Sequence, residues 1–121
     1  MEKIGLLFTV RARINIANLT PSKAIVDLDS LLSGVPEDKF VDNVYQIARI
    51  LNNEYEIDRR EKQGKEVNVK ENYAVITKDD IEAMTNVEFN EFYADIVGVL
   101  RGERTVEATP KKGKSQVQKS S

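Results

Sequence analysis

The clearest apolar pattern along this chain lies between residues 37 and 60. Apolar side chains recur there at the i, i+4, i+7 and i+8 spacing of one helix face, and polar residues occupy the other faces. The pattern predicts a long amphipathic helix that opens at Pro36 and reaches about Arg60, with Glu37 and Asp38 well placed against its N-terminal dipole. The expected stripe is Phe40, Val44, Ile47, Ala48, Leu51 and Tyr55.

Residues 4–18 carry two competing patterns. The segment is rich in β-branched residues, and alternate positions within it are apolar, as in a strand. These alternating positions are Val10, Ala12, Ile14 and Ile16. Alternatively, Thr9 caps a helix that places Val10, Ile14 and Ala17 on one face. We expect a short strand to about Phe8 and then a helix, but strand or helix stays open for residues 9–18.

A second helix start is predicted at Thr20. Its hydroxyl would accept a backbone N–H, while Pro21 occupies the first helical position, where its missing N–H costs nothing. The helix should end at Ser33 and Gly34, because glycine can adopt the left-handed conformation. Its apolar positions are Ala24, Ile25, Leu28, Leu31 and Leu32.

Residues 61–76 interrupt the helical pattern. We expect a mobile connection there, with Glu66 to Lys70 as a short strand or an extended loop. Thr77 and Asp80 then resemble a capping box for a helical turn that carries Ile81 and Met84.

A last helix is predicted from a cap at Thr85-Asn86 to a stop at Arg101-Gly102. Its apolar stripe belongs most simply to the core. An exposed part of the stripe would instead mark a site for a partner or for another copy of the chain. The stripe consists of Phe89, Phe92, Tyr93, Ile96, Val99 and Leu100.

The apolar pattern fails beyond Glu103. Residues 109–121 hold four lysines and no acid, and this composition cannot bury enough surface to offset the cost of ordering. We therefore expect one helical domain over residues 1–103 and a disordered basic tail over 104–121. The expected fold class is mainly α: a small single-domain helical bundle with a short N-terminal β element.

Charge and composition exclude several classes of function. The chain carries a net charge of −2 and its last 13 residues carry +4, so residues 1–108 carry the difference, −6. An acidic body argues against a nucleic-acid surface. The absence of cysteine and histidine excludes disulfides, Cys/His zinc sites and histidine-based catalysis. No signal peptide or membrane-length apolar segment is recognised, which favours a cytoplasmic protein without membrane contact.

Chemistry-bearing motifs are few. The sequence contains no P-loop, GxGxxG or GxSxG motif. Adjacent carboxylates are the remaining candidates for metal or acid–base chemistry, but they lie in first helical turns or on polar faces, where capping and solvation explain them better. We expect no catalytic residue, no metal site, no cofactor and no enzymatic activity. The pairs are Asp27 with Asp29, Glu37 with Asp38, and Asp79 with Asp80.

The candidate partner-binding residues combine part of the aromatic stripe with basic residues near the N-terminus. A groove would be lined by Phe89, Phe92, Tyr93 and Ile96, with Arg11 and Arg13 on its rim. A second basic cluster, Arg59 and Arg60, is either solvated charge paired with Glu56 or Glu61, or a docking surface for an acidic partner.

Three segments together resemble the tail assembly chaperones of long-tailed (siphophage-type) bacteriophages and prophages. Phe8 to Ile14 resembles the family's opening strand-to-helix turn, and Phe40 to Asn52 its central helix, which runs to a charged break at Arg59-Arg60-Glu61. Ile76 to Ile81, continued through Phe92 to Gly102, is similar to its closing block of a threonine, acids and an apolar helix. The match covers roughly residues 6 to 102.

The resemblance implies a non-enzymatic protein of virion morphogenesis that is absent from the finished particle. Such a protein binds the tape measure protein in the host cytoplasm and helps recruit tail tube subunits around it. Many members also have a longer form made by a −1 ribosomal frameshift, and adjacent lysine codons at Lys111-Lys112 would suit such slippage. The competing interpretation is a small protein-binding adaptor or regulatory module unrelated to tail morphogenesis.

Overall fold

The computed structural model describes residues 4–102 and 106–108, and it confirms a mainly helical fold. The elements are β1 (Ile4–Leu6), α1 (Val10–Ala17), a 3₁₀ turn (Ile25–Asp27), α2 (Asp29–Leu32), α3 (Glu37–Lys62), α4 (Lys78–Glu82), α5 (Asn86–Leu100) and β2 (Val106–Ala108). No helix in the described part of the chain is long and apolar enough to cross a membrane.

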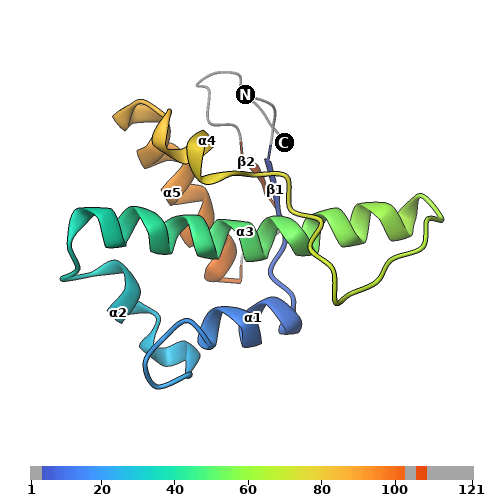
Figure 1. The fold of residues 1–121 in the computed structure, drawn as a ribbon, viewed down its shortest axis with the longest axis horizontal. Helices are drawn as coiled ribbons and strands as arrows, with labels where there is room; N and C mark the ends of the chain where they lie inside the picture. Colours follow the sequence, from blue (N-terminus) through green and yellow to red (C-terminus); the bar gives the residue numbers. More distant parts are fainter. Residues whose placement is uncertain (1–3, 103–105, 109–121) are drawn as a thin grey trace.

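Helix α3 is the central element, and the other elements are arranged along it. In Figure 1, α1 and α2 lie on one side of α3, α4 and the two strands lie on the other, and α5 crosses behind α3. The helix begins directly after Pro36, has acids in its first turn and bases in its last turn, and both charges suit the helix dipole. The predicted long helix is therefore confirmed, and it buries Val44, Ile47, Ala48 and Leu51 completely or nearly so.

Helices α4 and α5 each begin with a capping box. The Thr77 hydroxyl accepts the Asp80 N–H at 3.1 Å, and the Asp80 carboxylate accepts the Thr77 N–H at 2.9 Å. Thr85 and Glu88 repeat this arrangement at the start of α5. These reciprocal bonds satisfy backbone donors that a helix start leaves unpaired, so the sequence itself fixes where both helices begin.

The two strands join the ends of the described chain. β1 pairs antiparallel with β2, with Ile4 opposite Ala108 and Leu6 opposite Val106. The composition of residues 104–121 predicts a disordered tail that includes residues 106–108, but the structure places these three residues in the ladder. Their backbone groups pair with β1, a strand that is distant in sequence. The rest of the predicted tail, 104–105 and 109–121, lies outside the described residues.

The N-terminal segment follows the predicted strand and helix. The Thr9 hydroxyl accepts the Ala12 N–H at 3.0 Å and caps α1. Of the three residues expected on the core-facing side of α1, Ala17 is buried as predicted, but the prediction is wrong for Val10, which is 76% exposed, and for Ile14, which is 55% exposed. Helix α1 packs against α3 through Ala12 and Ile16, whose side chains are fully buried.

Thr20 does not cap a continuous helix. Its hydroxyl donates to the Ala17 carbonyl at 2.8 Å and accepts the Ala24 N–H at 3.1 Å, which closes a tight turn over residues 20–24. Lys23 adopts a left-handed conformation with φ of 59° inside this turn. Because a left-handed residue breaks the helical run, only the 3₁₀ turn and α2 form before Gly34, which has the predicted positive φ, 72°.

The connection between α3 and α4 is a loop. Residues 66–70 form no strand in the structure, which leaves the extended loop of the two alternatives. The buried amide of Asn52 on α3 holds the end of this connection: its nitrogen donates to the Gly5 carbonyl at 2.9 Å, and its oxygen accepts the Val75 N–H at 2.7 Å. One side chain thus links β1, α3 and the approach to α4.

Candidate partner-binding site

The predicted aromatic stripe divides between the core and the surface. Phe92 and Ile96 are 0% and 1% exposed, so the structure removes both from the candidate binding surface. Phe89 and Tyr93 are partly buried at the edge of the core. Since Phe89 and Tyr93 lie one turn apart on α5, they form a partly buried aromatic row beside α3.

An aromatic trio connects α5 with the first turn of α3. The Phe40 ring centroid lies 6.0 Å from that of Phe89, in an edge-to-face arrangement, and 5.5 Å from that of Tyr93. The Phe89 and Tyr93 rings are stacked with centroids 6.4 Å apart. Aromatic pairs at these distances contribute about 0.5–1.5 kcal/mol each beyond their area burial, so the trio fixes the position of Phe89.

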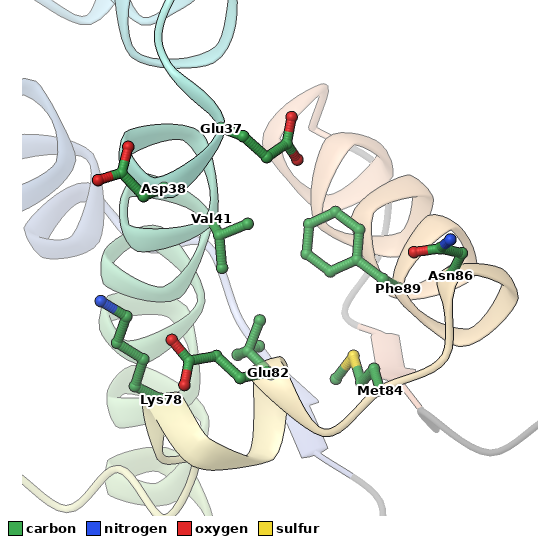
Figure 2. A pocket seen from close by; sticks show the side chains of 9 residues that line it. Glu37, Asp38, Val41, Lys78, Glu82, Met84, Asn86 and Phe89 are labelled. Carbon is green, nitrogen blue, oxygen red and sulfur yellow. The ribbon is translucent and has the colours of Figure 1, made fainter.

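A cleft of about 500 Å³ opens where α3, α4 and α5 meet. Figure 2 shows the Phe89 ring pointing from α5 toward Val41 on α3, with Met84 between α4 and α5. We call this hollow the α3–α4–α5 cleft. Its apolar lining is Val41, Ile81, Met84 and Phe89, and its polar lining is Glu37, Asp38, Lys78, Glu82 and Asn86.

The rim of the α3–α4–α5 cleft is acidic. Glu37, Asp38 and Glu82 are exposed there. Lys78 is the basic residue among the lining residues, and its Nζ lies 3.2 Å from the Asp42 carboxylate, just outside the lining. This pair compensates the lysine charge locally, so three carboxylates dominate the charge around an apolar floor.

Arg11 and Arg13 lie away from the α3–α4–α5 cleft. Arg11 Nε and Nη2 donate to the two Glu54 carboxylate oxygens on α3 at 2.8 and 2.9 Å. These hydrogen bonds raise the pKa of Arg11 above its ordinary value, against a smaller opposing effect of desolvation. Arg13 is exposed on α1. Arg11 therefore anchors α1 to α3, and the structure does not bring the two arginines to the aromatic row.

The two residues of the second basic cluster, Arg59 and Arg60, have different partners. Arg59 pairs with Glu56, one of the two partners expected from the sequence, with Nη2 2.7 Å from the carboxylate, and these hydrogen bonds raise the pKa of Arg59. The Arg60 guanidinium carbon lies 4.6 Å from the centroid of the Tyr73 ring, a cation–π distance. Arg59 thus supports the last turns of α3, and Arg60 joins the end of α3 to the loop that follows it.

The carboxylate pairs have local roles. Asp80 belongs to the α4 capping box, the Asp29 carboxylate accepts the Ser33 hydroxyl, and that of Asp38 accepts the Lys39 N–H. Within the described residues, no three carboxylate side chains are grouped closely enough to hold a metal ion.

Sequence reasoning missed the α3–α4–α5 cleft. The sequence places Ile81 and Met84 on one helical turn and explains Glu37 and Asp38 by the α3 dipole, but it does not bring these segments together. The available signal was the pair of threonine caps eight residues apart, which predicts a sharp corner between α4 and α5. Comparisons with protein-family models, curated protein sequences and solved structures found no match for this chain.

Proposed function

We propose that this chain is a non-enzymatic phage tail assembly chaperone. It binds the tape measure protein in the cytoplasm of the host bacterium, helps recruit tail tube subunits, and is absent from the finished particle. Within residues 4–102 and 106–108, no separate structural feature favours the alternative, a small protein-binding adaptor or regulatory module unrelated to tail morphogenesis.

The observation that carries this proposal is the α3–α4–α5 cleft. An apolar floor inside a polar rim is the usual form of a surface that takes one face of a partner helix. Because the cleft is small and its rim is charged, it suits a partner that must be released later, since rim charges act mainly on association rate and specificity. A tape measure protein is long and largely helical, as the family resemblance implies, and it must give up its chaperone when tube subunits arrive.

The order of elements also supports the proposal. The chaperone family resemblance implies a strand-to-helix turn, a central helix, and a closing block of threonine, acids and an apolar helix. This chain has β1 and α1, then α3, then the Thr77 capping box and α5, in the same order.

Co-expression tests this function. The chain is produced together with the tape-measure-type protein encoded beside it, and the soluble fraction of that protein is measured with and without the chain. We expect the chain to raise the soluble fraction and to co-purify with the tape measure protein. An unrelated coiled-coil protein of similar length is the control. Equal solubility with and without the chain, or a gene neighbourhood without any tape measure gene, would contradict the proposal.

A further inference from the structure

We infer that the α3–α4–α5 cleft selects a basic amphipathic helix: two apolar side chains one turn apart enter the cleft, and lysine or arginine side chains beside them meet the acidic rim. This inference rests on the proposed function and specifies which part of a partner the chain binds.

The size of the cleft sets how much of a partner it holds. An α-helix with its side chains is about 10–12 Å wide, so a hollow of about 500 Å³ cannot enclose one. The hollow has room for side chains from a single face. The floor combines Val41 on α3, Phe89 on α5 and Met84 between α4 and α5. Apolar side chains at i and i+4 lie side by side on one face of a partner helix, so such a pair can enter the hollow together.

The charges on the rim of the α3–α4–α5 cleft determine which partner helices can bind there. Glu37, Asp38 and Glu82 give the rim three negative charges, and the Lys78 charge is compensated by Asp42. The starts of α3 and α5 oppose these acids with about half a positive charge each. The acids still prevail, so the cleft attracts a basic partner and repels an acidic one.

The chain's own lysine-rich segment matches only half of this chemistry. Residues 109–121 hold four lysines, but Val117 is their one large apolar residue, and Pro110 and Gly113 disfavour a helix. It supplies charge without the apolar pair, so a separate helical partner is the better occupant.

Synthetic helical peptides provide the probe. One peptide carries leucines at i and i+4 flanked by lysines, and a second replaces each lysine with glutamate. Binding to the full chain is measured by fluorescence anisotropy at low and high salt. We expect the lysine peptide to bind, with affinity that falls as salt rises, and the glutamate peptide to bind at least about tenfold more weakly. Equal binding of the two peptides would overturn the inference.

Matched variants locate the binding. Glu82→Lys reverses one rim charge, and Glu91→Lys makes the same change at an exposed position of α5 that does not line the cleft. We expect Glu82→Lys to weaken lysine-peptide binding by about threefold to tenfold and Glu91→Lys to leave it within about twofold. Met84→Gln should also weaken binding. Equal effects of the two charge reversals would place the peptide elsewhere and overturn the inference.

A variant of the chain's own lysine-rich segment tests whether that segment, and not a separate partner, occupies the α3–α4–α5 cleft. Replacing Lys111, Lys112, Lys114 and Lys119 together by glutamine should change the affinity for the lysine peptide by less than about twofold. A gain in affinity above about tenfold would show that the chain's own segment occupies the cleft.

If the tape measure protein is bound and Glu82→Lys has no effect, the inference fails and the proposed function stands. If the lysine peptide binds at the cleft but the tape measure protein is not bound, the proposed function fails.

Discussion

Gly5 of β1 lies directly against the ring of Tyr55 on α3. A Cβ atom built on Gly5 would fall well inside van der Waals distance of three Tyr55 ring carbons. The backbone of β1 therefore approaches α3 more closely than any residue with a side chain would allow. This close approach also brings the Gly5 carbonyl within reach of the Asn52 amide, 2.9 Å away.

Gly5→Ala should destabilise the fold by about 1–3 kcal/mol, because β1 or the Tyr55 ring must move to make room. Urea unfolding measures the loss. Tyr55→Leu provides the test of cause: in that background the same glycine substitution should cost at least about 0.5 kcal/mol less. Strictly additive losses would show that the ring contact is not the reason.

Asn52→Ala should lower the free energy of unfolding by about 2–4 kcal/mol, because it leaves the Gly5 carbonyl and the Val75 N–H without their partner. The exposed Asn90 on α5 is the matched control, and Asn90→Ala should change stability by less than about 0.5 kcal/mol. Chemical denaturation of both variants checks the difference. An Asn52→Ala loss no greater than that of the control would contradict the linking role of this amide.

Arg11→Met should destabilise the protein by about 1–2 kcal/mol, since it leaves the Glu54 carboxylate without its bidentate partner. We place the loss below that of a fully buried ion pair because the Arg11 side chain is 43% exposed, although that of Glu54 is only 2% exposed. The control is Arg13→Met, the same change on the same helix, with little expected effect. Adding Glu54→Gln to Arg11→Met should recover part of the loss; no recovery would point to packing instead of charge.

Asp95→Asn should stabilise the protein at neutral pH. Burial raises the pKa of Asp95 above its ordinary value, and the nearby Glu91 charge adds to this effect. The folded state therefore holds this proton more tightly than the unfolded chain, so ionisation weakens the fold as pH rises from the ordinary pKa, 3.8, through the raised one. We expect the gain from Asp95→Asn at pH 7 to vanish near pH 3. Urea unfolding at both values tests this, and an equal gain at both would contradict it.

Local rules explain which elements the sequence predicted well. The α3 stripe and the two threonine caps depend on spacing within one segment, and α3, α4 and α5 form where that spacing predicts. The capping rule gives a wrong prediction at Thr20. Its hydroxyl makes the backbone bond expected of a cap, but it closes a turn instead, because a left-handed Lys23 is as compatible with that bond as a helix start.

The remaining features depend on segments that are distant in sequence. Helix α1 has apolar residues on two faces, and contact with α3 decides that Ala12 and Ile16 are buried while Val10 and Ile14 stay exposed. Arg11 finds its partner 43 residues away. The α3–α4–α5 cleft arises in the same manner, because its acids and its apolar floor come from three helices and the turn between α4 and α5, and no local spacing encodes how these segments pack.

The pairing of β1 with β2 gives the order of synthesis a physical meaning. Ile4 leaves the ribosome about 100 residues ahead of its partner Ala108. At about 5–20 residues per second, β1 waits roughly 5–20 s for its strand partner. During that interval the Leu7 N–H bond to Leu51 and the Gly5 bond to Asn52 can hold β1 on the nascent α3. The long helix thus serves as a temporary template that shields an unpaired strand edge until β2 has been synthesised.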